Sequence, residues 1–407
     1  LSKSLQKVSS GMKINGAADD ASGYAISERM RVQIRGLDQA NQNTQNGSSM
    51  MKVAEGAVSS TVDILKTLKE KVINAANDTN TDADRQTIQK ELDQSIDQIN
   101  DNANVTYNGK YLVDGSHNSK VTPTTTAMTN QSLNTNATFA SAFTSLTDRN
   151  GNSLNIQSSD TITLSYVKEG KTNTVTITAG TASISDLIGK VSTDLTTGEA
   201  TSVIGKDVAG DTVYTADGKP ALTIKAAADG IEGQISGITF SVTDTKGNVK
   251  KSANALLDNF SESIRAQNQS NDNSINLQVG TKSNQAIKVG LTDMRAEALG
   301  LQAKDGTTLN ISTKEYANAA INVLDSAVQK ALDQQTTIGA VQSRLEYTSS
   351  NLTTASENVQ ASESTIRDAD MAKEMTNYTK NNVLMQAAQA MLSQANQSSS
   401  SVLSLLQ

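Results

Sequence analysis

The sequence has no cysteine among its 407 residues, and it is also poor in aromatic side chains. Without cysteine, disulfide bonds, thiolate metal sites and cysteine nucleophiles are all excluded. Aromatic residues make up only 3%, with four Phe and no Trp. Large globular cores normally use more of these bulky groups. The composition therefore indicates helices packed through Ala, Leu, Ile and Val, in extended shapes with thin cores.

Proline, basic runs and long apolar runs are scarce as well. The two prolines, Pro123 and Pro220, both lie in the middle, which leaves the ends free to form uninterrupted helices. No apolar run is long enough to span a membrane. The net charge is −7 and no strong basic run occurs, which argues against nucleic acid as a partner. No signal peptide is visible at Leu1, and because Leu1 is not Met we expect that the chain has lost its true start.

Two segments, one near each end, carry an apolar residue at every seventh position. Such a repeat keeps one stripe of a helix facing a partner along its whole length. It predicts long helices over Ala21–Asn77 and Glu315–Arg367 that pair with each other, with one interruption at Thr44. The predicted seam consists of Leu37, Met51, Val58, Leu65 and Val72 in the first helix and Leu324, Ile338, Leu345, Leu352, Val359 and Ile366 in the second.

The middle of the chain has a different pattern. Residues 116–275 are rich in Thr, Asn and Ser, and their apolar residues alternate with polar ones, as in half-buried strands. Glu169-Gly170 and Asn108-Gly109 predict hairpin turns. We expect helix again over Ala253–Ala266, and Ser312-Thr-Lys-Glu315 is a capping box for the second long helix. The predicted fold class is α+β, a long antiparallel helical bundle with a β-rich insert.

The C-terminal segment, residues 381–407, contains no charged side chain. A lone helix with its wide apolar face would aggregate, so it needs a partner helix or copies of itself. The apolar residues that we expect at such contacts are Val383, Leu384, Met391, Leu403, Leu405 and Leu406.

No constellation for catalysis, a cofactor or a metal is visible. The single histidine, His117, lies in a polar turn, and there is no HExxH motif. Residues 78–89 begin like a calcium loop, but they have Ala83 where glycine is required and Gln89 at the twelfth position. The sequence predicts no enzyme.

Motifs at both ends resemble the bacterial flagellin family. Near the start they are Val8-Ser-Ser-Gly-Met-Lys-Ile-Asn15, Ala18-Asp-Asp-Ala21, Arg35-Gly-Leu37, Ala54-Glu-Gly-Ala57 and Tyr107-Asn-Gly109. Near the end they are Ile366-Arg-Asp-Ala-Asp-Met371, Gln394-Ala-Asn396 and Val402-Leu-Ser-Leu-Leu406. The resemblance covers roughly residues 1–115 and 275–407, and Thr161–Val191 looks like the hook IN motif of flagellin inserts. The family normally has a further helical stretch before Leu1, so we expect an N-terminal truncation.

The resemblance implies a structural subunit that polymerises with itself into the flagellar filament for swimming motility. It implies an innermost helical domain of residues 1–20 and 367–407, a rod of residues 21–115 and 276–366, and a surface-exposed variable insert of residues 116–275. It also implies type III export, a secreted location, an export chaperone and a cap protein as partners, and recognition by innate immune receptors.

A charged cluster surrounds the start of the first long helix. Its members are Asp19, Asp20, Arg29, Arg31 and Arg35. A solvated helix face is one interpretation, and ion pairing between subunits is the other.

The immune interpretation rests on one stretch of the first helix. The family's stimulatory sequence reads Leu-Gln-Arg-Val-Arg-Glu-Leu, and here it is Leu65, Lys66, Thr67, Leu68, Lys69, Glu70 and Lys71. Arginine offers a planar set of donors that Thr67 lacks. We therefore predict weak activation of the receptor.

Two alternatives remain open at this point. A hook–filament junction protein shares the helical ends, although the Ile366–Met371 run and the LSLLQ ending favour the filament protein. The polar, β-rich insert would also suit binding of surface glycans.

Overall fold

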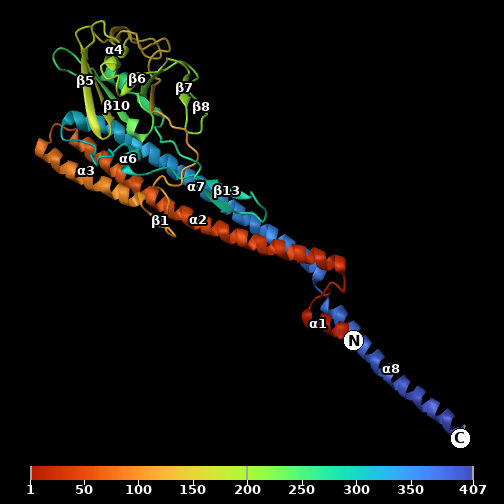
Figure 1. Ribbon diagram of the computed structural model, residues 1–407. Helices are drawn as coiled ribbons and strands as arrows, with labels where there is room; N and C mark the ends of the chain where they lie inside the picture. The colour runs from red at the N-terminus through yellow and green to blue at the C-terminus, as the bar shows by residue number, and fades with distance from the viewer. Residues whose placement is uncertain (1, 199, 406–407) are drawn as a thin grey trace. The chain divides into compact units, whose positions relative to one another are not determined.

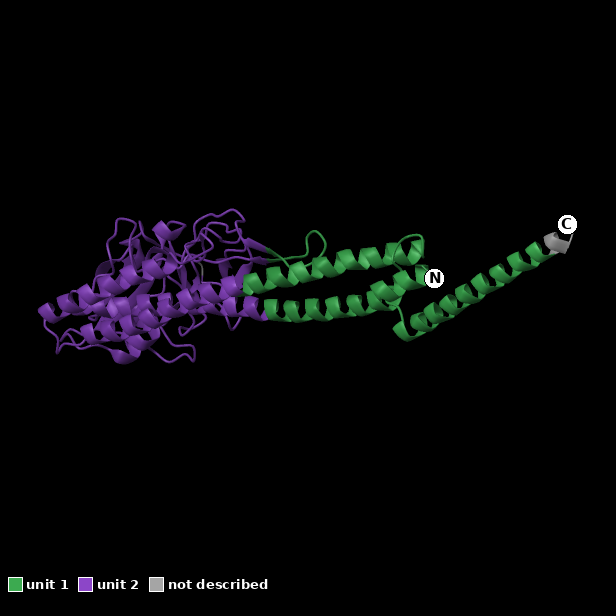
Figure 2. Ribbon diagram, turned by 90° about the horizontal axis from the view of Figure 1, so that it is seen from below, with its two compact units in different colours: residues 1–48, 277–287, 344–407 green, residues 49–276, 288–343 purple. Residues whose placement is uncertain are grey.

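The computed structural model describes residues 2–198 and 200–405, which form two compact units (Figure 2). The terminal unit combines residues up to 48, residues 277–287 and residues from 344 onward. The central unit combines residues 49–276 and 288–343. Helices α2 (Ala21–Ala75) and α7 (Lys314–Arg367) each contribute to both units. Among the described residues, no helix is long and apolar enough to cross a membrane.

The terminal unit is almost entirely helical. Besides its parts of α2 and α7, it contains α1 (Ser2–Ser10) and α8 (Met371–Leu405), and α1 packs against α8 (Figure 1). Leu37 and Leu352 are buried together between α2 and α7, with Val359 packed against them. The heptad spacing thus places apolar side chains of α2 and α7 in one contact.

Side chains at their first turns explain where the long helices begin. Asp20 Oδ1 accepts hydrogen bonds from the backbone nitrogens of Ser22 and Gly23, at 3.1 and 3.0 Å, so Asp20 caps α2. The expected helix bounds are confirmed to within two residues. At α7 the predicted cap is one residue out: Thr313, not Ser312, accepts from the backbone nitrogen of Tyr316, at 3.2 Å.

Strands β12 (Ile275–Gln278) and β13 (Ala286–Val289) form a hairpin that contacts α2. Leu277 sits over Gly47, where an added Cβ would lie 2.6 Å from a Leu277 methyl carbon. Asn43 Nδ2 donates to the Gln278 carbonyl at 3.1 Å. Glycine at position 47 therefore lowers the helix propensity of α2, but because it has no Cβ it allows the hairpin to approach the helix.

The central unit adds helices and two larger sheets to its parts of α2 and α7. One sheet has the order β11-β3-β9-β6 and the other β10-β4-β5. The strands of the first sheet are β11 (Phe260–Ile264), β3 (Ala127–Asn130), β9 (Leu222–Ala226) and β6 (Leu195–Thr197), and those of the second are β10 (Ile235–Thr243), β4 (Thr161–Lys168) and β5 (Lys171–Thr178). The short hairpins are β1 (Thr106–Tyr107) with β2 (Lys110–Tyr111) and β7 (Val203–Lys206) with β8 (Thr212–Tyr214). The helices are α3 (Asp82–Ala103), α4 (Ile184–Gly189), α5 (Lys251–Leu257) and α6 (Ala296–Leu299), with 3₁₀ turns at Phe143–Ser145 and Ile231–Gly233.

Two predicted hairpins have the turn chemistry that the sequence indicates. In the β4–β5 turn, Glu169 and Gly170 have φ of 50° and 70°, and in the β1–β2 turn Asn108 and Gly109 have φ of 50° and 76°. Positive φ at both central residues is typical of the turn whose twist matches paired strands. Both hairpins are therefore confirmed.

The prediction of helix over Ala253–Ala266 is only half right. Helix α5 ends at Leu257, and β11 begins at Phe260. Phe260 stacks on Phe240, with ring centroids 5.4 Å apart, and β11 pairs with β3. Pairing with a strand far away in sequence overrides the local helical pattern.

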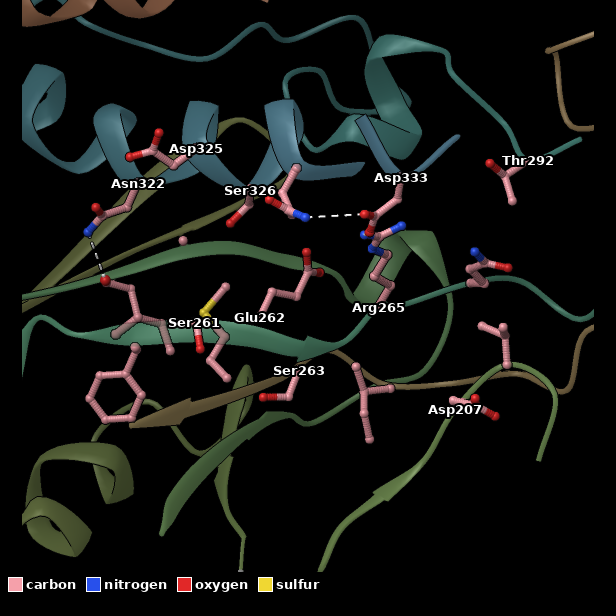
Figure 3. Close-up of a pocket in the computed structure, with 18 of the residues that line it drawn as sticks. Asp207, Ser261, Glu262, Ser263, Arg265, Thr292, Asn322, Asp325, Ser326 and Asp333 are labelled. Atoms are coloured by element: carbon pink, nitrogen blue, oxygen red, sulfur yellow. Dashed lines mark hydrogen bonds and ion pairs between the residues drawn. The ribbon is translucent and has the colours of Figure 1, made fainter. Parts of the chain in front are cut away.

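Asp258 lies between α5 and β11 and contacts α7 (Figure 3 shows this region). Its Oδ1 accepts from the Phe240 backbone nitrogen at 3.2 Å and from Asn322 Nδ2 at 3.3 Å. Burial dominates over these hydrogen bonds and raises the pKa of Asp258 to about 6.

The raised pKa makes stability depend on pH. Because the folded state binds this proton more tightly than the unfolded state, stability falls as pH rises from about 4 to about 6. We expect Asp258→Asn, which keeps an acceptor for Phe240, to stabilise the central unit by about 1–2 kcal/mol above pH 7. Near pH 3.5 the gain disappears. Urea denaturation of wild type and Asp258→Asn at both pH values measures the difference in their free energies of unfolding. An equal gain in stability at the two pH values would contradict the raised pKa of Asp258.

Candidate functional site

A buried arginine organises the place where α1 leads into α2 and α7 leads into α8. The side chain of Arg367 is only 7% exposed, and its Nη1 donates to Glu28 Oε1 at 2.6 Å. Its guanidinium lies over the ring of Tyr24, 5.5 Å from the centroid. The hydrogen bond from Arg367 lowers the pKa of Glu28. The Arg367 carbonyl also accepts from the backbone nitrogen of Lys13, at 2.7 Å.

A second ion pair and a backbone bridge continue this contact. Arg31 Nε donates to Glu363 Oε1 at 3.0 Å. The Ala369 backbone nitrogen donates to the Gly11 carbonyl at 3.0 Å. The two connecting segments are thus tied to each other by side-chain and main-chain bonds within the terminal unit.

The predicted charged cluster is divided among several roles. Asp20 caps α2, Asp19 Oδ2 accepts from the Asn15 backbone nitrogen at 3.1 Å, and Arg31 joins the contact around Arg367. Arg29 and Arg35 are exposed. Sequence reasoning missed Arg367 as a functional residue, although it belongs to the Ile366–Met371 motif.

The described side chains in the C-terminal half of α8 are not covered within the terminal unit. Every described side chain from Val383 to Ser401 is exposed. Val383 and Leu384 are 59% and 54% exposed, and Met391 and Leu392 are 71% and 63% exposed. The side chains of Leu403 and Leu405, and all of Leu406, lie outside the described residues.

The seam residues are mostly buried in the unit to which each belongs. In the central unit these are Met51, Val58, Leu65, Val72, Leu324 and Ile338, and in the terminal unit Leu37, Leu345 and Leu352. Val359 and Ile366 are half-buried. Thr44, the interruption in the repeat, is buried too, and its hydroxyl donates to the Ala40 carbonyl at 2.8 Å. An internal hydrogen bond therefore makes a polar residue tolerable at this position.

The stretch from Leu65 to Lys71 has one buried and one open side. Leu65 and Leu68 are buried, whereas Thr67 and Glu70 are exposed. Lys69 pairs with Asp325 of α7, and Lys71 Nζ lies 3.0 Å from Glu91 Oε1 of α3. The open side is a helical surface of mixed charge.

The described residues hold no group of three or more His, Cys, Asp or Glu placed to bind a metal ion. His117 is only half-buried, and its Nδ1 lies 3.2 Å from the Asn273 carbonyl oxygen. The terminal unit therefore presents surfaces for contact with other molecules, namely exposed apolar residues on α8 and exposed charged residues on α2.

Both ends of the chain match family descriptions of flagellin. Residues 1–118 match the bacterial flagellin N-terminal helical region, and residues 321–406 match the C-terminal helical region. A flagellin of Clostridium tyrobutyricum is 36% identical over 399 residues, which cover 97% of this chain and 93% of that protein. A flagellin of Bacillus subtilis (strain 168) is 30% identical over 424 residues, covering 99% of this chain and 92% of that protein.

Solved structures resemble the chain more weakly. The flagellar junction protein FlgL from Legionella pneumophila is 16% identical and gives a TM-score of 0.34, covering 84% of this chain and 99% of that chain. A likeness of this size bears on neither function nor assembly.

Proposed function

This chain belongs to the bacterial flagellin family and is a subunit of the flagellar filament, and we propose that its polymer contacts are made by the exposed part of α8. The observation that carries the proposal is the exposure of Val383, Leu384, Met391 and Leu392, at 54–71%. Covering these four side chains would contribute on the order of 5 kcal/mol per subunit. Copies of the same helix are suited to cover them, because residues 381–407 contain no charge that a polymer would repeat.

The charged start of α2 supplies a second proposed contact. Arg29 and Arg35 are exposed, and Asp19 and Asp20 lie at the N-terminal end of the same helix. Opposite charges at separate places on one subunit would pair when copies are stacked. Such pairs set register and specificity more than affinity.

Placing a charge in the exposed apolar surface tests the proposal. Met391→Lys adds a charge that every subunit repeats, so we expect filament formation to be lost. Asn150→Lys, in an exposed loop of the central unit, is the matched control and should assemble normally. Sedimentation and electron microscopy of the polymer measure the outcome. If Met391→Lys assembles at the same critical concentration as wild type, the exposed part of α8 does not form the polymer interface.

The family also supports a layout and a route of delivery. We propose that residues 1–20 and 367–407 form the innermost layer, residues 21–115 and 276–366 the rod, and residues 116–275 the outward insert. Export through the flagellar type III apparatus, an export chaperone, folding under a cap protein and an extracellular location belong to the same proposal. The identity to proteins named flagellin favours the filament over the hook junction.

Recognition by innate immune receptors is proposed to be weak. The open side of α2 has Thr67 where the stimulatory sequence has Arg, and Lys71 is engaged with Glu91. We expect the double substitution Thr67→Arg and Lys71→Leu to increase potency about tenfold, since Arg restores a multi-donor contact. A dose–response curve in a receptor-reporter cell line measures this, with Lys52→Arg as control. Wild-type potency equal to that of a strongly stimulatory flagellin would refute the proposal.

A further inference from the structure

Strand β5 is an edge of the three-stranded sheet β10-β4-β5 in the central unit (Figure 1). It is eight residues long, and its pairing with β4 runs without a register shift from Lys171 to Thr178. It contains no proline, and Lys171 is its single charged residue. Long, regular edges with little charge are templates for pairing with another strand.

The other edges of the two larger sheets are protected. At β10, the Phe240 backbone nitrogen donates to Asp258, and Asn322 of α7 donates to the Ile238 carbonyl at 3.1 Å. Strand β11 has a register shift between Glu262 and Ile264, and β6 is only three residues long. Side-chain partners, bulges and short length are the usual protections of a sheet edge. Among the described strands of these two sheets, β5 is therefore the edge on which another strand can pair.

The register with β4 determines which main-chain groups of β5 point outward. The two-residue turn makes Lys168 and Lys171 a hydrogen-bonded pair, so every second residue from Lys171 onward bonds to β4. The residues between them direct their N–H and C=O groups away from β4, and these are Thr172, Thr174, Thr176 and Thr178. On this side Lys190 Nζ donates to the Thr176 carbonyl at 3.4 Å. Lys190 is exposed, so a partner strand can displace its flexible side chain.

The side chains of β5 suit a second copy of the same strand. The hydroxyl oxygens of Thr174 and Thr176 lie 3.3 and 3.4 Å from those of Ser165 and Thr163 on β4. Such cross-strand hydroxyl pairs stabilise a sheet. Because its outward residues are all threonines, a second β5 would continue the same pattern across the new edge.

We propose that the β5 strands of two subunits pair in antiparallel orientation around Val175, which joins their inserts, residues 116–275, in one continuous sheet. This register is two-fold symmetric and places Val175 opposite its own copy. Thr172 then pairs with Thr178 of the partner subunit, and Thr174 pairs with Thr176 of the partner subunit. Each pair exchanges both of its outward main-chain hydrogen bonds.

Charge and packing favour a second copy as the occupant of this edge. The antiparallel register places the two Lys171 side chains at opposite ends of the joined strands, so like charges do not meet. It also covers Val175 and Ile177, which are only half-buried against the core of the central unit. One strand pair is weak by itself, but a filament holds its subunits at a high effective concentration. The contact lies on the insert and is separate from the exposed surface of α8.

The absence of cysteine from the chain permits a direct test. The proposed register brings the two Val175 Cα atoms to about 4.5 Å, within the range of a disulfide. Val175→Cys should therefore form covalent dimers when the full chain is oxidised with diamide below its critical concentration for polymerisation. Thr174→Cys is the control, because Thr174 is more exposed but lies diagonally from its own copy. It should cross-link at least about fivefold more slowly. Non-reducing gel electrophoresis over time measures both rates.

A second variant removes a main-chain donor instead of adding a thiol. Thr174→Pro lacks one outward N–H but keeps the bonds to β4, and proline is tolerated on edge strands. In the Val175→Cys background it should slow cross-linking at least about tenfold, since the symmetric pair loses a hydrogen bond on each side. Urea denaturation should give the midpoint of Val175→Cys alone, which shows that the fold is kept.

Two results would overturn the proposal. Equal cross-linking rates of Val175→Cys and Thr174→Cys would mean that the subunits meet by random collision. An unchanged rate after Thr174→Pro would mean that the main chain of β5 makes no contact. The double variant Val175→Cys/Met391→Lys should cross-link as Val175→Cys does even where no filament forms, so this test is independent of the proposed α8 contact.

Discussion

Substituting Glu262 by Leu lowers the free energy of unfolding of the central unit by about 3–5 kcal/mol, whereas the double variant Glu262→Leu/Lys330→Met regains wild-type stability or exceeds it. Glu262 is the ion-pair partner of Lys330, and the Lys330 residue is only 4% exposed. Removing the carboxylate alone leaves a buried ammonium without its counter-charge. Replacing both groups by apolar side chains removes the desolvation penalty of both charges. Urea denaturation of the two variants and of wild type measures the difference.

The pH dependence of the single variant has a definite sign. Burial is the main cause that lowers the pKa of Lys330, and Glu262 opposes it. Without Glu262 the pKa falls further, so the unfolded state binds more protons than the folded state in the alkaline range. Stability then rises with pH, and Glu262→Leu recovers part of its loss above neutrality.

An exposed pair provides the control for this experiment. Lys304 and Glu232 are 2.7 Å apart, but their side chains are 73% and 62% exposed. Water already solvates both charges, so Glu232→Leu should change stability far less than Glu262→Leu. If Glu232→Leu and Glu262→Leu lowered the free energy of unfolding equally, the burial of Lys330 would make no difference to stability.

Local patterns in the sequence predicted the helices and hairpins because their causes are local. Seven-residue spacing defines α2 and α7, and the Glu169-Gly170 and Asn108-Gly109 pairs define their own turns. Thr44 interrupts the apolar repeat in the sequence, but its side chain is buried and its hydroxyl donates a hydrogen bond within α2. These elements need no information from distant parts of the chain.

The features that sequence reasoning missed all depend on distant contacts. Strand β11 exists because Phe260 reaches Phe240 and β3, although its own sequence continues a helical pattern. The pair of Glu262 and Lys330 joins residues 68 positions apart. The sequence around Glu262 and around Lys330 does not indicate that either charged side chain is buried, because exposed helices and strands contain the same residue types. The sequence shows Arg367 only as one residue of the Ile366–Met371 motif, and nothing there indicates that its side chain is buried.

Arg367→Leu should loosen the contact between the two connecting segments of the terminal unit by about 2 kcal/mol. The variant loses the charge-assisted bond to Glu28 and the contact with the Tyr24 ring. Arg367→Lys recovers only part of the loss, because a compact ammonium cannot reproduce the planar guanidinium over that ring. Hydrogen exchange of the backbone amides of Lys13 and Ala369 measures this local opening directly.

The same contact should weaken in acid. Because Arg367 lowers the pKa of Glu28, the stabilisation is present above the unfolded pKa of the carboxyl group and is lost as pH falls through the folded pKa. The difference in exchange between wild type and Arg367→Leu should therefore narrow below pH 4.5. Lys373→Leu, an exposed basic residue on α8, is the control and should exchange as wild type does. If Arg367→Leu shows wild-type protection at neutral pH, the main-chain bonds of Lys13 and Ala369 hold the two segments together without the guanidinium, and the buried arginine serves packing alone.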